Sequence, residues 1–157
     1  PAAPAPEGTV VEKAPVLPYP PVDLGDHRGY VKIAAHETDG ALLLTEVEVD
    51  CGGGVPPHIH TREDETFYIL EGTFTFGVGE TTVTVGPGEC VYGPRGVKHA
   101  WQCDSLEGGR MLIYFTPGEN FQAFGMAMGE KGMVPSAPKD PAAFLALAER
   151  FGITMLF

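Results

Sequence analysis

The sequence predicts an all-β domain built from short antiparallel strands. Between residues 29 and 115, short runs rich in Val, Ile, Thr, Phe and Tyr alternate with glycine turns. These runs recur about every ten residues, which is the spacing of a β-sandwich or a small barrel. The 21 glycines and 15 prolines among 157 residues also favour tight turns over long helices.

The chain divides into three predicted segments. Residues 1–22 hold seven prolines and should form an extended arm, because proline cannot continue a helix. Residues 23–118 hold the strand runs and should form the β-barrel. Residues 119–157 should form a helical extension that packs on the barrel. The predicted strands are, in order, YVKIAAH, ALLLTEVEV, TFYIL, TFTFGV, TTVTV, ECVY, KHAWQC and RMLIYF.

Two short helices are predicted after the last strand. The stretch FQAFGMAMGEKG reads as a helix that ends at glycine. In DPAAFLALAERFG, Asp140 can cap the helix, Pro141 suits its first position, and Gly152 follows as a stop signal. One apolar stripe of the second helix should face the barrel, and it consists of Phe144, Leu145, Ala148 and Phe151.

Charge and cysteine content exclude several classes of function. The net charge of −11 opposes binding to nucleic acid or to an anionic membrane surface. No stretch has the 18 or so apolar residues of a membrane helix, and no signal peptide is visible, although one removed earlier would leave no trace. Cys51, Cys90 and Cys103 form no C-x-x-C pair, so we expect three free thiols, each a small buried apolar residue, and a cytoplasmic location.

One stretch, GGGVPPHIHTREDETFYILEG (residues 52–72), has the composition of a metal site. His58 and His60 are two residues apart, so in a strand they point to the same face. Imidazole and carboxylate groups are common ligands of transition metals, and the short link TRED can bring Glu65 back beside them. His99, in GPRGVKHAW, is a fourth candidate. The other two histidines, His27 and His36, lack such spacing and are predicted to be surface or loop residues.

The spacing of two motifs resembles that of the cupin superfamily. The first motif consists of Gly52, His58, His60, Glu65 and Gly72, and the second consists of Gly88, Pro94, Gly96 and His99. The resemblance covers roughly residues 40–116. It implies a small antiparallel jelly-roll barrel with one metal ion, and the ligands that it implies are His58, His60, Glu65 and His99.

One position departs from the cupin pattern. The second motif commonly ends in asparagine four residues after its histidine, and here that position is Cys103. Because this asparagine is not a usual ligand, metal binding is unaffected. By strand alternation His99, Trp101 and Cys103 share a face, and we interpret Cys103 as a small buried apolar residue there.

The predicted ligand set indicates a catalytic site. Three imidazoles and one carboxylate leave a divalent ion with open positions, as in catalytic rather than structural sites. The donor types fit Fe, Mn, Ni, Co and Zn alike. Aromatic and apolar side chains near the ligands favour a flat aromatic or enolic substrate over a sugar or phosphate. The predicted pocket residues are Phe67, Phe74, Phe76, Trp101, Met111 and Phe115.

The C-terminal part also resembles the tail of quercetinase-like single-domain cupins, in YFTPGENFQAFGMAMGEKG and DPAAFLALAERFGITML. That resemblance implies a flavonol 2,4-dioxygenase-like oxidoreductase, acting with dioxygen on a polyphenol or an aromatic polyketide, in which Glu65 also accepts the substrate's hydroxyl proton. We also expect a homodimer, because small cupin barrels commonly pair and the proline-rich arm has no obvious place on its own barrel. Two alternatives stay open. One is a non-redox cyclase or isomerase of natural-product biosynthesis, and the other is a cupin that binds a small molecule without turnover.

Overall fold

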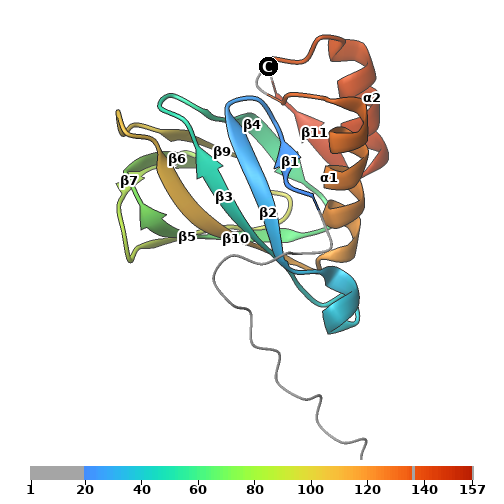
Figure 1. The fold of residues 1–157 in the computed structure, drawn as a ribbon, viewed down its shortest axis with the longest axis horizontal. Helices are drawn as coiled ribbons and strands as arrows, with labels where there is room; N and C mark the ends of the chain where they lie inside the picture. Colours follow the sequence, from blue (N-terminus) through green and yellow to red (C-terminus); the bar gives the residue numbers. More distant parts are fainter. Residues whose placement is uncertain (1–19, 136, 157) are drawn as a thin grey trace, which may run out of the picture.

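The computed structural model describes residues 20–135 and 137–156, which form two antiparallel sheets packed face to face (Figure 1). The strand order in the larger sheet is β1-β2-β3-β10-β5-β8, and in the smaller sheet it is β11-β4-β9-β6-β7. The larger sheet contains β1 (Val22–Asp23), β2 (His27–Ile33), β3 (Leu43–Val49), β10 (Gly109–Thr116), β5 (Asp64–Glu71) and β8 (Cys90–Gly93). The smaller sheet contains β11 (Ile153–Met155), β4 (Gly54–His60), β9 (His99–Cys103), β6 (Phe74–Val78) and β7 (Thr81–Val85). The predicted all-β antiparallel fold is therefore confirmed, as a sandwich of two sheets.

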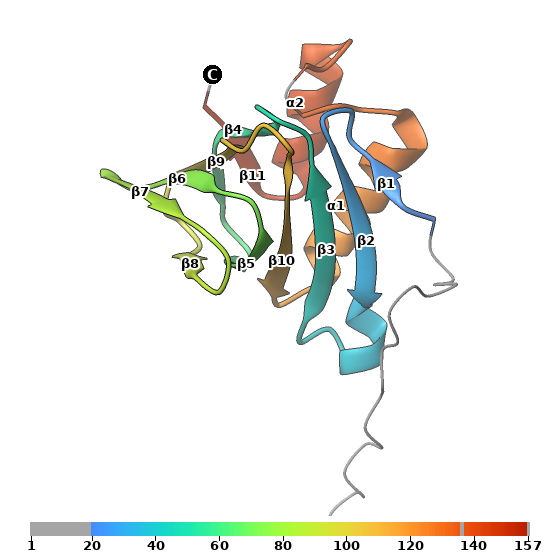
Figure 2. The same ribbon diagram turned by 60° about the vertical axis from the view of Figure 1, so that its left-hand side comes forward.

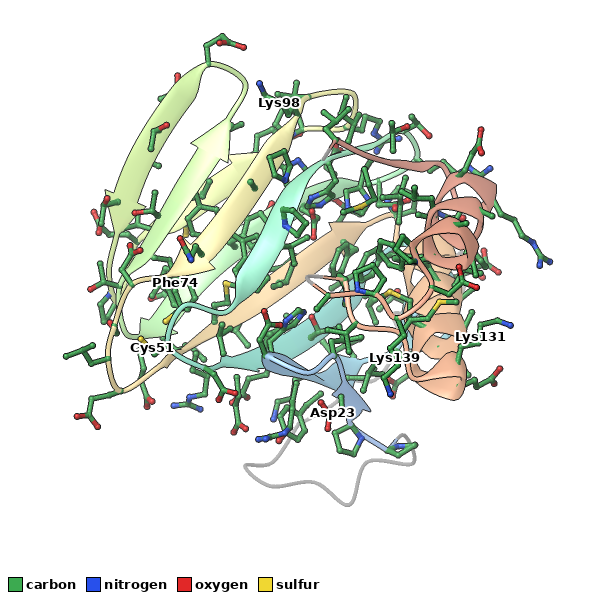
Figure 3. All side chains as sticks on the ribbon, turned by 90° about the horizontal axis from the view of Figure 1, so that it is seen from above. Asp23, Cys51, Phe74, Lys98, Lys131 and Lys139 are labelled. Atoms are coloured by element: carbon green, nitrogen blue, oxygen red, sulfur yellow. The ribbon has the colours of Figure 1, made fainter. Side chains whose placement is uncertain are left out.

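Alternation of side chains along the strands explains the core between the sheets. In β6, Phe74 and Phe76 point inward and are fully buried, and in β10 Met111, Ile113 and Phe115 do the same. Since successive residues of a strand face opposite sides, each strand buries one apolar row. The edge strand β7 is largely exposed, in keeping with its threonine-rich sequence. Figure 3 shows side chains filling the space between the sheets, with Phe74 far from the helical side, where Lys131 is labelled.

Both predicted helices are present and pack beside β1 and β11 (Figures 1 and 2). Helix α1 (Glu119–Lys131) ends at Gly132, and a short 3₁₀ helix, η1 (Ala35–Thr38), lies between β2 and β3. Helix α2 (Pro141–Arg150) begins as predicted, because the Asp140 side chain accepts a hydrogen bond from the backbone N–H of Ala143. These helices bury a second apolar cluster, consisting of Phe124, Met128, Phe144, Leu147, Ala148 and Ile153.

The predicted apolar stripe of α2 is wrong at one position. Leu145 is 38% exposed, and Leu147 is buried in its place. Phe144, Leu147 and Ala148 are three and four residues apart along the helix, which is the spacing of one helical face. Leu145 is only one residue from Phe144 and so points away from that face.

The chain on either side of the predicted barrel contributes strands that the sequence pattern did not predict. Strand β11 pairs with β4, and β1 pairs with β2. The predicted arm, residues 1–22, lies outside the described residues except at its end, where Val22 begins β1 on the chain's own domain. The homodimer stays a prediction. Neither α1 nor α2 has the length and apolar character needed to cross a membrane.

Two of the three cysteine predictions are wrong. Cys103 is buried in the core, as predicted, but Cys51 and Cys90 are exposed. Cys51 lies in the turn before β4, and Cys90 begins β8 on its outward face. All three thiols are free.

Candidate metal centre

Strands from both sheets bring the four predicted ligands together. His58 and His60 lie on β4, and His99 lies opposite His58 on the paired strand β9. Glu65 comes from β5 in the other sheet and points across the sandwich toward them. Pro56 and Pro57 cannot donate hydrogen bonds to β9, and the β4–β9 pairing is irregular between Val55 and His58. All four ligand residues are buried.

One carboxylate oxygen lies at the centre of this cluster. Oε2 of Glu65 is 2.5 Å from Nε2 of His99, 3.3 Å from Nε2 of His60 and 3.7 Å from Nε2 of His58. The four ligand atoms all lie within 4.8 Å of one another. Donor atoms that share one transition-metal ion at about 2.1 Å lie some 3–4 Å apart, so small side-chain movements would place all four around one ion.

Hydrogen bonds at the opposite ring nitrogen prepare each histidine to bind a metal. The Nδ1 atoms of His58 and His99 lie 2.8 and 3.1 Å from the carbonyl oxygens of Pro56 and Val97. Because a carbonyl only accepts, each Nδ1 carries a proton and donates it. When Nε2 carries a proton, it can donate a hydrogen bond to Glu65, which it faces. When the ring is neutral in this tautomer, Nε2 instead keeps a lone pair that can bind a metal. The donor set therefore fits a divalent transition metal.

The electrostatics of the cluster also favour a cation. Burial would raise the pKa of the Glu65 carboxyl, but the nearby charge of His60 and hydrogen bonds from His58 and His99 outweigh burial and hold the pKa well below its usual range. Burial lowers the pKa of His58. Burial also opposes charge on His99, but its hydrogen bond to Glu65 raises the pKa above the usual value. An anionic carboxylate among closely packed imidazoles is the charge pattern of a metal-binding site.

Glu63 is a buried partner of the site that the sequence pattern did not reveal. Its side chain is only 1% exposed, and its Oε1 lies 2.7 Å from Nδ1 of His60. Its Oε2 accepts a hydrogen bond of 3.0 Å from Nδ2 of Asn120, at the start of α1. Asn120 also donates to the backbone oxygen of Phe151 and accepts from Arg62. The C-terminal helices thus hold the carboxylate that orients one predicted ligand.

We expect Glu63→Ala to lower the metal affinity about 10- to 100-fold, because outer carboxylates fix the tautomer and orientation of ligating histidines. The dissociation constant can be measured by competition with a chromophoric chelator. Glu80→Ala is the matched control, since Glu80 is an exposed carboxylate paired only loosely with Lys98 at 3.7 Å. An unchanged affinity in Glu63→Ala would contradict this role of Glu63.

A cavity of about 770 Å³ opens onto the cluster from between the sheets. His58, His60 and Glu65 line it, together with residues of β1, β2, β3, β10 and α1. Of the predicted pocket residues, Trp101 and Phe115 line this cavity. The other four, which are fully buried in the core rather than on the cavity wall, are Phe67, Phe74, Phe76 and Met111.

The prediction that His27 is a surface residue is wrong. His27 is 6% exposed and lines the same cavity, with its ring edge-on to Trp101. No partner spacing for His27 is visible in the sequence, because its neighbours come from other strands. His36, on η1, is exposed as predicted.

Three buried histidines and one glutamate lie together inside an antiparallel double sheet, so the protein is a β-sandwich with side chains that could hold one metal ion. Residues 45–115 match the family model described as Cupin domain. The matched stretch contains both sequence motifs and supports the predicted relationship to the cupin superfamily.

Known proteins that resemble this chain have different activities. Quercetin 2,3-dioxygenase from Bacillus subtilis (strain 168) is 28% identical over 119 residues, which are 76% of this chain and 35% of that enzyme. This chain thus spans only about a third of that relative. The polyketide cyclase RemF from Streptomyces resistomycificus is 29% identical with a TM-score of 0.52, over 59% of this chain and 66% of that one. KdgF from Halomonas sp., at 18% identity, shares the fold, with a TM-score of 0.59 over 66% of this chain and 93% of that one.

Proposed function

We propose that this protein is a metal-dependent enzyme that acts on an aromatic or enolic small molecule by a dioxygenase reaction of the quercetinase type. The observation that supports it most directly is the cavity, which is mainly apolar and ends on His58, His60 and Glu65. A substrate in this cavity would meet the open side of a metal bound there. The relationship to quercetin 2,3-dioxygenase adds support from sequence.

The cavity wall favours a flat apolar substrate. Its volume of about 770 Å³ is in the usual range for sites that hold drug-sized molecules. Among the described residues that line it there is no arginine or lysine, which a phosphate or sugar phosphate would require. Trp101, Phe115 and Phe121 supply aromatic faces, and the rings of Phe115 and Phe121 stack 3.6 Å apart. These rings would also exclude water from the site.

The residues at the end of the cavity would have different roles in the proposed reaction. A divalent transition metal there would supply Lewis acidity toward a chelated enol or phenol and, if redox-active, reactivity with dioxygen. His58, His60 and His99 would hold it through Nε2. Glu65 Oε2 lines the cavity beside these nitrogens, so it can accept the proton that the substrate hydroxyl releases. Glu63 and Asn120 keep His60 in place throughout.

A second candidate function is a non-redox cyclase. The 29% identity to the polyketide cyclase RemF supports it, because a polyketide is also a flat, enolic molecule that would fit an apolar cavity. With zinc in the site, the same residues would support acid–base chemistry without dioxygen. A third hypothesis is a cupin that binds a small molecule without turnover. In that protein the same cavity would hold the ligand, and no product would form.

Metal analysis and an oxygen assay separate these functions. For the dioxygenase we expect about one Fe, Mn, Ni or Co ion per chain in protein purified without added metal, and oxygen consumption with a panel of flavonols. Stoichiometric zinc without oxygen uptake would contradict the dioxygenase and favour the cyclase. If the aromatic compounds bind but are never consumed, with either a redox-active metal or zinc in the site, the results support a cupin that binds a small molecule without turnover.

A further inference from the structure

The buried His27 lies in the cavity but outside the metal cluster. It begins β2, and its Nδ1 is 2.6 Å from Oδ1 of Asp26. Asp26 is held in turn by the backbone, because its Oδ2 accepts from the N–H of Gly54 and its carbonyl oxygen accepts from Asp50. Among the described residues, His27 is the one buried titratable side chain on the cavity wall that is not a predicted metal ligand.

The hydrogen bond to Asp26 determines which nitrogen of the His27 ring is a donor. An ionised carboxylate only accepts hydrogen bonds, so Nδ1 of His27 donates a proton to Asp26, and the neutral ring in this tautomer has its lone pair on Nε2. Within the described part of the chain, this ring makes its hydrogen bond through Nδ1. Among the described residues, no buried side-chain nitrogen lacks both a hydrogen-bond partner and contact with solvent, so Nε2 of His27 is accessible to solvent, and the His27 ring lines the cavity. It is therefore an acceptor that a ligand hydroxyl can reach.

Trp101 fixes where this acceptor lies relative to the metal centre. The rings of His27 and Trp101 meet edge to face, with centroids 5.4 Å apart. Trp101 is two residues beyond His99 on the same face of β9, which corresponds to about 7 Å along the strand. The indole therefore forms a wall between two polar positions, with the metal ligands at one end and His27 toward the other.

A purely packing role does not account for this arrangement. Apolar side chains make up most of the wall, and a leucine or phenylalanine at position 27 would complete it without needing Asp26. A ring nitrogen that faces an apolar cavity loses solvation, and this costs free energy unless a partner restores the hydrogen bond. The Asp26 carboxylate, which orients the ring, is a second polar group that a packing role for His27 would not require.

We propose that Asp26 and His27 form a second polar subsite, in which Nε2 of His27 accepts a hydrogen bond from a substrate hydroxyl remote from the metal. This inference rests on the proposed function and narrows its substrate class. The substrate would be a polyhydroxylated aromatic molecule that chelates the metal at one edge and presents a phenol group at the other. Trp101 would lie against the ring system between the two.

Two flavonols provide a matched pair of probes. Quercetin and 3-hydroxyflavone share the 3-hydroxy-4-oxo edge that can chelate a metal, but only quercetin carries further hydroxyls. Their affinities for protein loaded with Zn²⁺, which prevents reaction with dioxygen, can be measured by calorimetry. Because Trp101 is the single tryptophan of the chain, its fluorescence gives a second binding signal from the cavity itself.

We expect the wild type to bind quercetin about tenfold more tightly than 3-hydroxyflavone, which is the effect of one buried hydrogen bond. His27→Phe should abolish this preference while leaving 3-hydroxyflavone affinity and zinc content unchanged. His27→Gln, whose amide can reach the same position, should retain part of it. His36→Phe is the control, since His36 is exposed on η1.

The possible failures are distinguishable. If His27→Phe keeps the wild-type preference for quercetin, the subsite is refuted and the proposed function is untouched. If the wild type binds neither flavonol, the proposed substrate class and this inference both fail. Should His27→Phe not fold, as judged by its thermal melt, His27→Ala removes the ring without added bulk and is judged by the same criterion.

Discussion

Replacing His99 with alanine is expected to remove the bound metal and to abolish turnover. His99 supplies the Nε2 atom nearest to Glu65, at 2.5 Å, and is 1% exposed, so water cannot easily replace it in the same geometry. Loss of an outer partner of a ligand typically lowers metal affinity 10- to 100-fold, so loss of the ligand itself should exceed about 100-fold. Metal content after dialysis and the chelator-competition constant measure the effect directly.

The control for this substitution is His36→Ala, which removes an exposed imidazole on η1 and should leave both metal content and activity at the wild-type level. Thermal melts of the metal-free proteins show whether His99→Ala still folds. Glu65→Gln gives a second test, because it keeps the size of the side chain but removes the central negative charge. An active His99→Ala protein with unchanged metal content would mean that the ligand set is wrong.

The clustering of the four candidate ligand residues could be predicted from the sequence, because their placement depends mostly on local rules. His58 and His60 share a face by the two-residue period of a strand, and the same period places Glu65 in line with the buried Phe67. The position of His99 came from the second motif and its resemblance to cupins. The structure then brings His99 opposite His58 through the pairing of β4 with β9.

The residues that the sequence did not predict depend on contacts between distant segments. Glu63 lies in the link TRED, where strand alternation gives no direction, and its buried side chain is hydrogen-bonded to His60 and to Asn120 of α1. His27 is buried by Trp101, which is far away in the chain. Strand β11 follows a helix and has three residues, too few for a periodic pattern. In each case a contact with a distant segment, rather than the local sequence pattern, determines whether the residue is buried or the strand forms.

Gly54→Ala is expected to produce a large loss of stability, because the backbone of β9 lies close to Gly54 of β4. A Cβ atom at this position would lie 2.2 Å from the backbone oxygen of Trp101 and 2.9 Å from Cα of Gln102. Both atoms belong to the backbone of β9, so no flexible side chain can move aside. Overpacking a well-packed site typically costs about 1–3 kcal/mol, and a backbone clash places this variant at or above the upper end.

The same substitution should also weaken metal binding, because the shift would pass along β4 toward the site. Gly54 pairs with Gln102, Val55 with Trp101, and His58 with His99 in the same ladder.

Gly77→Ala on β6 is the matched control: no atom lies within 4 Å of a Cβ there, so stability should stay within about 1 kcal/mol of wild type. Urea unfolding of the metal-free proteins measures both variants. Equal stability of Gly54→Ala and Gly77→Ala would show that β4 and β9 are not held as closely as the structure places them. A Gly54→Ala protein that is unstable but binds metal normally would show instead that the site tolerates a displaced β4.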